Sequence, residues 1–323
     1  MRIGSTELTH GLMLAPMAGF TDRAMRLVCH EQGCEYSVTE MVSAKAVVFG
    51  DKKTYRLARI REDEGAVGLQ IFGSEPSVMA EAAGRLGSGC EGFASPIAID
   101  INMGCPVNKI YSNGEGSALM KSPELIERIV AATKSAVSIP VSVKLRLGID
   151  PSHVNIVECA TAAESGGASF IAIHGRTRTQ MYSGEADLET IGNVKSYLHI
   201  PLIANGDITD AASAARAFSV TGADAIMIGR GAVGNPFIFK EIECMLTGRE
   251  YTEPSLEEKI EVAIKQLRAA VEDKGEAVAI PEARKQTALY LKGFRGSAAI
   301  RARINRATTL TEAADALRSA LDS

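Results

Sequence analysis

Eight short apolar runs, each followed by a segment that can form a helix, constrain the fold of this chain more than any other feature of its sequence. Most of the runs are continuous rather than alternating, which is typical of parallel strands covered on both faces. Eight βα units within roughly 230 residues predict an α/β fold, a (β/α)8 TIM barrel. A doubly wound sheet is the alternative, but it usually has fewer strands and a glycine-rich turn after the first strand, whereas no G-x-G-x-x-G surrounds Gly19. The runs cover residues 12–17, 36–39, 67–72, 97–103, 141–145, 170–174, 202–205 and 225–228.

The segments between the runs carry signals of helix ends. Ser122-Pro123 is a good N-cap and first-turn pair in front of an apolar face at residues 125–133. Residues 153–165 and 211–219 have a similar pattern, and the first of these ends at Gly166-Gly167. We therefore predict that these segments are helices around the barrel.

The composition changes after Gly248, and no strand pattern follows. Ser255 and Glu258 form a capping box, and a helical pattern continues from there to residue 273, in front of Gly275. The chain is therefore predicted to contain two domains, a catalytic TIM barrel of residues 1–247 and a small all-helical domain of residues 248–323.

Composition excludes several classes of protein. The net charge of −4 argues against a protein that is basic throughout. The first six residues contain no apolar core of signal-peptide length, and no apolar run approaches the ~18 residues of a membrane span, so we expect a cytoplasmic protein without membrane contact. The six cysteines contain no CxxC pair, which predicts reduced thiols and no metal site. We also expect a monomer.

One cysteine stands where the fourth apolar run stops, in the heptapeptide DINMGCP at residues 100–106. Gly104 and Pro106 break the strand on either side of Cys105, so a rigid scaffold would hold the thiol at a strand end. An unperturbed pKa of ~8.5 leaves a thiol mostly protonated at neutral pH, and it could act as an acid or as a nucleophile. The alternative is that Cys105 is simply a small buried hydrophobe.

Polar residues follow nearly every predicted strand. In a TIM barrel the carboxyl ends of the strands form one ring, and this ring carries the active site. Each residue alone also has a structural interpretation, since Gln70 could cap a turn, Lys144 could be a solvated end and His174 a core histidine. Their joint appearance predicts a site instead. The ring would contain Ala15-Pro16-Met17-Ala18-Gly19, Glu40, Gln70, Asn102 with Cys105, Lys144 with Arg146, His174 with Arg176, Asn205-Gly206-Asp207 and Gly229-Arg230-Gly231.

The chemistry of this ring suggests FMN. Glycines after the seventh and eighth strands, together with Arg230, form the usual phosphate site of a barrel. Lys144 and His174 would supply donors in the middle of the ring, where a flat anionic heterocycle would lie, and Gln70 can pair with an amide-like ring edge. A lysine near the N1/C2 carbonyl of a flavin would stabilise its anionic reduced form.

The same residues resemble the tRNA-dihydrouridine synthases over nearly the whole chain, from about residue 14 onward. The tail segments ARK (283–285) and YLKG (290–293) look most like the bacterial B-type branch of that family. That branch commonly has histidine after the Arg-Lys pair, whereas this chain has Gln286. The matching segments are APMAGFTDR (15–23), QIFG (70–73), DINMGCP (100–106), KLRLG (144–148), HGRT (174–177), IANGDI (203–208) and MIGRGAVGNP (227–236).

The resemblance implies an FMN-dependent reduction of the uracil C5–C6 bond in tRNA, with NADPH as the electron source. Reduced flavin would give hydride to C6, and Cys105 would give a proton to C5. Asn102 and Arg146 would contact the uracil ring, with Arg176 also assigned to the substrate, and the base would have to be flipped out of its stack. The residues implied for FMN are Ala15, Pro16, Met17, Gln70, Lys144, His174, Asn205, Gly206, Asp207, Gly229 and Arg230.

Residues 284–306 form a basic segment without an acidic residue, and Tyr290 and Phe294 lie within it. A charge run is often only a solvated helix face. An enzyme that acts on one base of a folded RNA must also hold the phosphates around it, so we predict that this segment binds tRNA. The cations assigned to tRNA are Lys285, Lys292 and Arg295.

Two other functions remain as alternatives. An FMN barrel that acts on a free pyrimidine or another small molecule would share the phosphate site but would not need a helical domain with a basic, acid-free segment. An RNA-binding protein without catalysis would need the basic segment, but Cys105, Lys144 and His174 would then have no function.

Overall fold

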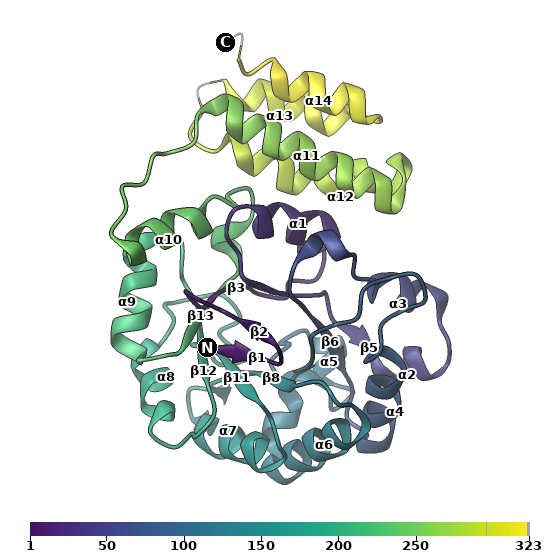
Figure 1. Ribbon diagram of the computed structural model, residues 1–323, viewed down its shortest axis with the longest axis vertical. Helices are drawn as coiled ribbons and strands as arrows, with labels where there is room; N and C mark the ends of the chain where they lie inside the picture. The colour runs from purple at the N-terminus through teal and green to yellow at the C-terminus, as the bar shows by residue number, and fades with distance from the viewer. Residues whose placement is uncertain (295, 322–323) are drawn as a thin grey trace.

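The computed structural model describes residues 1–294 and 296–321, and its larger part is a closed barrel of parallel strands (Figure 1). Each predicted apolar run forms one strand. In chain order each strand pairs with the next, and the last pairs with the first, which closes the ring. The predicted TIM barrel is therefore confirmed. Its strands are β3 (Leu12–Leu14), β4 (Tyr36–Val38), β6 (Val67–Phe72), β7 (Ala98–Asn102), β8 (Val141–Arg146), β11 (Phe170–His174), β12 (Leu202–Asn205) and β13 (Ala225–Ile228), and the short β5 (Val42–Ser43) also pairs with β6.

Helices surround the barrel, as the sequence pattern predicts. The expected apolar face of the helix after Pro123 is buried at Ile126, Ile129 and Val130. None of the helices in the described parts of the chain is long and apolar enough to cross a membrane. The helices of the barrel are α1 (Arg23–Glu31), α2 (Ala44–Val48), α3 (Lys52–Leu57), α4 (Pro76–Leu86), α5 (Asn108–Tyr111), α6 (Pro123–Ala136), α7 (Ile156–Ser165), α8 (Leu188–Lys195), α9 (Ala211–Thr221) and α10 (Ile238–Thr247), with 3-10 turns η1 (Glu62–Glu64), η2 (Gly116–Lys121) and η3 (Arg230–Ala232).

The helix predicted to begin at residue 153 begins later, because a small hairpin precedes it. β9 (Gly148–Asp150) pairs in antiparallel fashion with β10 (His153–Val154). The Asp150 carboxylate holds the turn by accepting hydrogen bonds from the backbone N–H and the hydroxyl of Ser152, at 2.9 and 2.6 Å. This local side-chain bonding competes with helix formation, so α7 starts only at Ile156.

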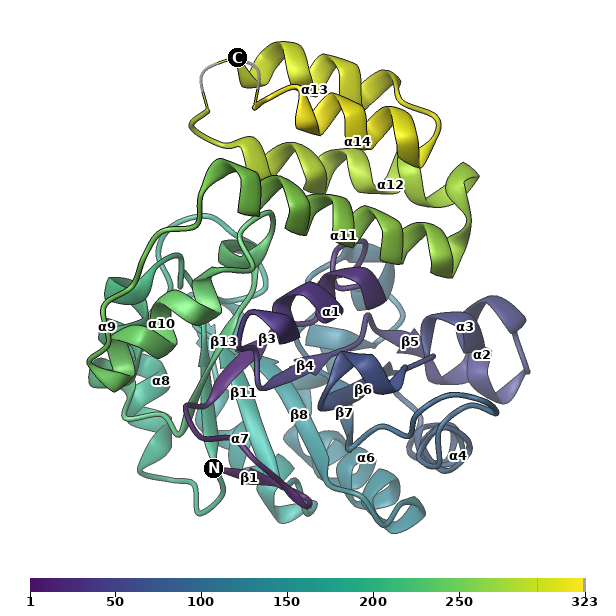
Figure 2. The same ribbon diagram turned by 45° about the horizontal axis from the view of Figure 1, so that its top comes forward.

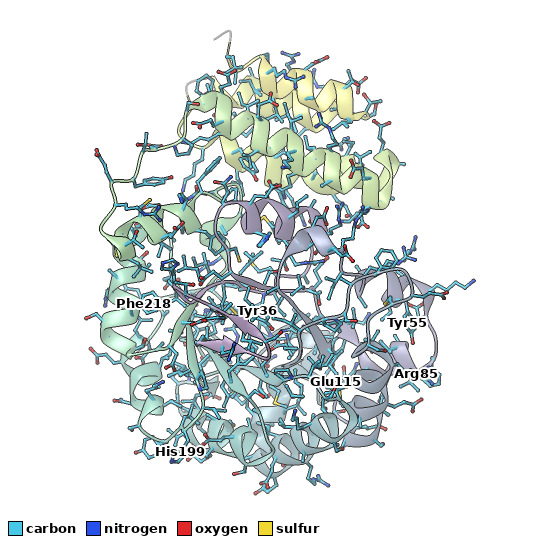
Figure 3. The ribbon with its side chains drawn as sticks, viewed as in Figure 1. Tyr36, Tyr55, Arg85, Glu115, His199 and Phe218 are labelled. Carbon is cyan, nitrogen blue, oxygen red and sulfur yellow. The ribbon has the colours of Figure 1, made fainter. Side chains whose placement is uncertain are left out.

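The amino-terminal end of the barrel is filled and closed. Tyr36 on β4, which is labelled in Figure 3, packs against Phe170 on β11, and the two rings meet edge to face with centroids 6.0 Å apart. A Cβ atom at Gly68 would lie 1.9 Å from the Tyr36 hydroxyl, so only glycine fits there. A hairpin of β1 (Arg2–Ile3) and β2 (Thr6–Glu7) adds buried apolar residues to the same cluster. The cavity described below lies at the opposite, carboxyl end of the strands.

The remaining helices form a bundle with its own apolar cluster, and α11 packs along α1 of the barrel (Figure 2). The predicted capping box is present, since the backbone N–H of Glu258 donates to the Ser255 hydroxyl at 3.2 Å and the backbone N–H of Ser255 donates to the Glu258 carboxylate at 2.7 Å. In the described residues no strand follows β13. The bundle contains α11 (Leu256–Lys274), α12 (Glu276–Thr287), the 3-10 turn η4 (Ala288–Leu291), α13 (Ser297–Arg306) and α14 (Leu310–Arg318).

A buried ion pair ties α1 to the 3-10 turn η1 of the barrel. The side chains of Arg26 and Glu64 are 2% and 0% exposed, and Arg26 Nε lies 2.6 Å from Glu64 Oε2. Burial raises the pKa of Glu64, and the neighbouring Arg26 opposes that shift. Replacing Arg26 by methionine leaves a buried carboxylate without its partner, so we expect unfolding free energy to fall by about 3–5 kcal/mol.

Urea unfolding measures this loss. The double variant Arg26→Met with Glu64→Gln removes the stranded charge and should recover most of the stability. A single variant as stable as the parent would show that the pair does not stabilise α1.

Candidate active site

A cavity of about 1010 Å³ opens at the carboxyl ends of the strands, and this size is sufficient for a cofactor-sized ligand. Ala15, Arg176 and Lys285 do not line it, and Arg295 lies outside the described residues. In the parts of the chain that the structure describes, no group of three or more His, Cys, Asp or Glu side chains is placed to hold a metal ion. The predicted residues that line the cavity are Pro16, Met17, Gln70, Asn102, Cys105, Lys144, Arg146, His174, Asn205, Gly206, Asp207, Gly229, Arg230 and Lys292.

A chain of side-chain hydrogen bonds crosses three neighbouring strands and ends at the cysteine loop. Ser142 Oγ donates to Asp100 at 2.6 Å, and Gln70 Nε2 donates to the other oxygen of that carboxylate, also at 2.6 Å. Asn102 Nδ2 donates to Gln70 Oε1 at 2.9 Å. Asn102 Oδ1 in turn accepts the backbone N–H of Cys105 at 2.9 Å. The amides of Gln70 and Asn102 are thus fixed in orientation before any ligand binds.

Sequence reasoning missed Asp100 and Ser142, which anchor this chain of hydrogen bonds. Both are buried, and burial raises the pKa of Asp100 while the bonds from Gln70 and Ser142 oppose the shift. The sequence did contain a signal for Asp100, because side chains in a strand alternate between its two faces. Residues 98, 100 and 102 share one face of β7, and a buried carboxylate within an otherwise apolar strand requires hydrogen-bonding partners.

Cys105 presents a protonated thiol to the cavity. Its residue is 9% exposed, and its backbone carbonyl accepts a hydrogen bond from the Ser117 hydroxyl at 2.8 Å. A Cβ atom at Gly116, whose φ is +59°, would lie 3.0 Å from the Cβ of Cys105, so the adjoining turn can pack only with glycine. Burial raises the pKa of the Cys105 thiol, and the Arg146 charge opposes this only in part. The thiol is therefore suited to donating a proton rather than to attacking as a thiolate.

Lys144 and His174 lie on the neighbouring strands β8 and β11, where His174 is paired with Arg146, and they differ in charge. Lys144 Nζ donates to Asn205 Oδ1 at 2.9 Å, and burial, with the neighbouring Arg146, lowers the pKa of Lys144 to about 8. Burial and the surrounding cations, Lys144 first among them, lower the pKa of His174, so its imidazole is neutral. Arg176 Nη1 lies 3.4 Å from His174 Nε2, and since arginine can only donate, Nε2 accepts and Nδ1 carries the proton.

Arg176 acts as a clamp behind the cavity wall. It is 1% exposed and pairs with both oxygens of Asp207 at 2.8 and 2.7 Å. Partial burial acts to raise the pKa of Asp207, but the hydrogen bonds from Arg176 act in the opposite direction, and the pKa is lowered overall. Arg230 Nη2 also donates to Asp207, at 3.1 Å, from the exposed mouth of the cavity. The structure therefore places Arg176 away from the substrate position that the sequence predicted, with its donors engaged inside the protein.

The loops after β12 and β13 lie against each other with no room for side chains. A Cβ atom at Gly231 would lie 2.2 Å from the carbonyl oxygen of Ile208. A Cβ atom at Gly206, whose φ is +138°, would lie 2.6 Å from the Cβ of Ala186. Such bare backbone beside Arg230 can approach an anionic group closely, as at barrel phosphate sites.

Other residues that line the cavity come from segments whose position next to it could not be predicted from the sequence. Tyr182, in the loop after β11, is 54% exposed, and its ring lies 4.9 Å from the guanidinium carbon of Arg230 and 5.9 Å from that of Arg146. Leu289, Tyr290 and Lys292 contribute a wall from the helical bundle. A Cβ atom at Gly234 would lie 2.5 Å from the Cβ of Leu289, so bundle and barrel touch directly at this wall.

The cations of the basic segment differ in their surroundings. Lys285 is exposed, and its ammonium lies 4.4 Å from the centre of the Phe20 ring. Arg284 Nη2 donates to the carbonyl of Ala307 at 2.8 Å and so holds the bundle together. Arg301 is exposed on α13. Of the exposed cations of this segment, which also include Arg303 and Arg306, we consider Lys285, Lys292 and Arg301 for RNA contacts.

The fold and the cavity define a (β/α)8-barrel protein whose site lies at the carboxyl ends of its strands. The family model "Dihydrouridine synthase (Dus)" matches residues 13–323. The chain belongs to the dihydrouridine synthase family.

Similar proteins agree with this membership. A relative from Rickettsia conorii, named "Probable tRNA-dihydrouridine synthase", is 41% identical over 307 residues, which cover 94% of this chain and 91% of the relative. "tRNA-dihydrouridine synthase B" of Serratia marcescens is 41% identical over 320 residues, 98% of this chain and 94% of that protein. A solved structure of morphinone reductase, with 13% identity, a TM-score of 0.53, and coverage of 80% of this chain and 91% of that chain, is alike in fold.

Proposed function

We propose that this chain is an FMN-dependent tRNA-dihydrouridine synthase, which reduces the C5–C6 double bond of a tRNA uridine with NADPH as reductant. The observation that carries this proposal is the placement of a protonated thiol, Cys105, in the same cavity as Lys144, under a wall contributed by a helical bundle whose segment 284–306 is basic. Family membership and the names of the relatives support the substrate.

The donor set of the cavity fits FMN. Gly206, Gly229 and Arg230 border the part where a phosphate would be held, and Lys144 lies deeper, where a ring carbonyl would receive its charged hydrogen bond. Gln70 is held rigidly by Asp100 and Asn102, so its amide can align with the edge of a ring. When bound, the flavin supplies the hydride that reaches C6 of the uracil.

The chain's own residues supply the proton and position the base. Cys105 gives its proton to C5, so one hydride and one proton saturate the double bond, and the resulting thiolate takes a proton back from solvent. Asn102 and Arg146 border this part of the cavity, and the Arg146 side chain is oriented by the carbonyls of Gly104 and Thr177 at 2.9 and 2.8 Å. This fixed guanidinium is suited to binding a uracil carbonyl.

The partner is tRNA, whose uridine must leave its stack to enter the cavity. We assign residues 1–247 to catalysis and residues 248–323 to tRNA binding, and we expect a monomer that works in the cytoplasm. Lys285 and Lys292 on the bundle, and Arg295 in the same segment, are the proposed phosphate contacts.

A single-turnover experiment separates this function from action on a free pyrimidine. The protein is loaded with FMN, reduced with NADPH without oxygen, and mixed with either tRNA that lacks dihydrouridine or free uridine monophosphate. We expect tRNA, but not the mononucleotide, to restore the visible absorption of oxidised flavin within the turnover time. Equal reoxidation by the mononucleotide would instead favour a small-molecule reductase.

The two cationic positions in the cavity should respond differently to substitution. Arg230→Ala should mainly weaken FMN binding, because Arg230 lies at the exposed mouth with the glycine loops, whereas Lys144→Ala should also slow flavin reduction by NADPH, by about 10-fold or more.

Because the pKa of Lys144 is about 8, its charge is lost as pH rises through that value. FMN affinity should therefore weaken between pH 7 and 9, and Lys144→Arg should flatten this dependence because arginine stays charged.

Fluorescence titration with FMN and stopped-flow absorbance measure these two effects. If both alanine variants bind and reduce FMN like the parent, the assignment of the cavity is wrong.

A further inference from the structure

The loop of residues 17–20 lies between the cavity and the helical bundle. Met17, Ala18 and Phe20 line the cavity, and Gly19 adopts a φ of +76°. The loop closes on itself through hydrogen bonds from the backbone N–H of Phe20 and of Thr21 to the Met17 carbonyl, at 2.9 and 3.0 Å. The carbonyls of Gly19 and Phe20 accept hydrogen bonds from a side chain of the bundle. A side chain that binds these carbonyls therefore also fixes the position of the loop, which forms one wall of the cavity.

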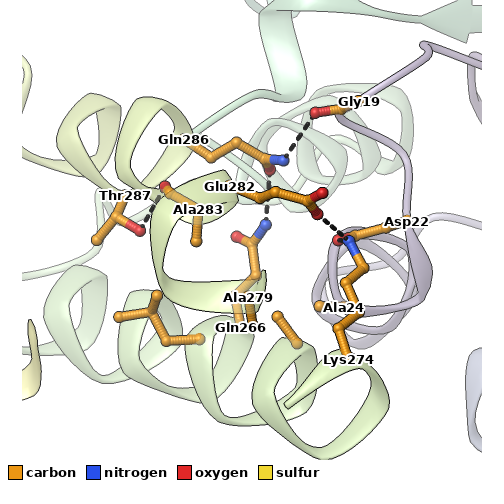
Figure 4. Close-up of a pocket in the computed structure, with 12 residues that line it drawn as sticks. Gly19, Asp22, Ala24, Gln266, Lys274, Ala279, Glu282, Ala283, Gln286 and Thr287 are labelled. Atoms are coloured by element: carbon orange, nitrogen blue, oxygen red, sulfur yellow. Dashed lines mark hydrogen bonds and ion pairs between the residues drawn. The ribbon is translucent and has the colours of Figure 1, made fainter. Parts of the chain in front are cut away.

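A buried glutamine of the bundle holds them. Gln286 on α12 is 5% exposed, and its Nε2 amide group donates to the Phe20 carbonyl at 3.3 Å and to the Gly19 carbonyl at 3.5 Å. Figure 4 shows the bond to Gly19. Gln286 Oε1 accepts a hydrogen bond from Gln266 Nε2 at 2.8 Å. Gln266 Oε1 in turn accepts the Tyr290 hydroxyl at 2.7 Å. Tyr290 itself lines the cavity.

These contacts join two walls of the cavity through three side chains. One end of the relay is the 17–20 loop of the barrel, and the other end is Tyr290 on η4 of the bundle. The side chains of Gln286, Gln266 and Tyr290 are buried, so the bonds between them are protected from competition with water and each broken bond strands a polar group. The relay therefore ties the barrel and bundle walls into one rigid frame.

We propose that Gln286 is a positioning residue for the cofactor: through its amide it fixes the 17–20 loop against the bundle and so sets the geometry of the flavin cavity. This inference rests on the proposed function, since it takes FMN as the ligand. Gln286 does not line the cavity and touches neither cofactor nor substrate, so its effect passes through the loop.

The chemistry required at this position is one donor toward the loop and one acceptor toward Gln266. An amide provides both, and a neutral histidine also provides one donor and one acceptor. The histidine that the resembling branch commonly has at this position would therefore meet the same requirement. A methionine has a similar shape but provides no donor, and a glutamate provides only acceptors, which would face two carbonyl oxygens.

Other contacts hold α12 in place when the amide is changed. Lys274 at the end of α11 pairs with Asp22, the N-cap of α1, at 2.6 Å and with Glu282 of α12 at 2.9 Å. The Lys285 ammonium also lies over Phe20. A volume-conserving change at Gln286 should therefore leave the fold intact and affect mainly the loop.

The test compares the parent with Gln286→Met, Gln286→Glu and Gln286→His, and with Thr287→Val as a matched control. Thr287 is the neighbouring buried residue, and its hydroxyl donates to the Ala283 carbonyl within α12 at 2.9 Å (Figure 4). Each purified full-length protein is checked by circular dichroism and thermal unfolding and then titrated with FMN.

We expect Gln286→Met and Gln286→Glu to raise the dissociation constant for FMN by about 10-fold and to shift the absorption spectrum of the bound flavin, because a lost buried hydrogen bond leaves the loop carbonyls unpaired. Gln286→His should restore the constant to within about 2-fold of the parent. Thr287→Val should lower thermal stability without a change in FMN affinity. A folded protein from either Gln286→Met or Gln286→Glu is sufficient to test whether Gln286 positions the loop.

Parent-like FMN affinity in a folded methionine or glutamate variant would overturn this inference and leave the proposed function intact. Equal loss of affinity in the histidine variant would overturn it as well, because the hydrogen bonds would then not be the cause. Absence of FMN binding by the parent chain would overturn both this inference and the proposed function.

Discussion

Replacing Cys105 by alanine should lower the rate of dihydrouridine formation by about 10²–10⁴-fold, the usual contribution of general acid catalysis, while FMN binding stays unchanged. Burial raises the pKa of the thiol, so nearly every Cys105 side chain carries a proton at neutral pH. Alanine removes this proton without disturbing the backbone N–H that Asn102 accepts. Serine should rescue little, because an alcohol is a much weaker acid than a thiol.

The measurement is product formation from tRNA, with the FMN dissociation constant determined on the same samples. Cys244→Ala serves as the matched control, because Cys244 is also buried but lies on α10 and does not line the cavity. We expect it to retain parent activity. Near-parent activity of Cys105→Ala would remove the thiol from the mechanism.

The second large effect concerns tRNA binding. Simultaneous replacement of Lys285, Lys292 and Arg301 by alanine should weaken tRNA binding by about 100-fold at 0.1 M salt and reduce the slope of log affinity against log salt by about 2–3, since each phosphate contact contributes ~0.7–0.9 to that slope. The three cations lie on the bundle or at the cavity mouth and are exposed. FMN affinity should not change with Arg301→Ala alone, because Arg301 does not line the cavity.

A control variant must change net charge equally. Lys53→Ala, Arg128→Ala and Arg216→Ala together remove three exposed cations from α3, α6 and α9 of the barrel. We expect a much smaller loss of tRNA affinity there, because a diffuse field contributes less than direct contacts. Equal losses in both triple variants would mean that the basic segment is not the RNA site.

The fold was predictable from sequence because its signals are local and periodic. Each apolar run became a strand, and the capping box at Ser255 marks the start of α11 as expected. The error at residue 153 has a local cause too, since Asp150 and Ser152 form a hairpin turn that a helical pattern alone does not reveal. Boundaries depend on such side-chain bonds, whereas the alternation of strands and helices does not.

The site was only partly predictable, because its remaining features come from tertiary contacts. Strand-end residues such as Lys144 and His174 were found because a barrel must bring them together. The role of Arg176 as a clamp depends on Asp207, which lies one strand further along the chain. The contacts of Tyr290 and Gln286 with the cavity and its loop depend on how the bundle packs on α1, and no local pattern encodes that packing.

The central claim is that this chain reduces uridine within tRNA, and nucleoside analysis of treated tRNA tests it most directly. The purified protein with FMN and NADPH is incubated with tRNA transcribed in vitro, which is then digested and examined by mass spectrometry. The account predicts a uridine that gains two hydrogen atoms, formed only when protein and NADPH are both present and strongly diminished with Cys105→Ala. Absence of this nucleoside from tRNA treated with the FMN-loaded protein, under conditions where NADPH reduces the flavin, would contradict it.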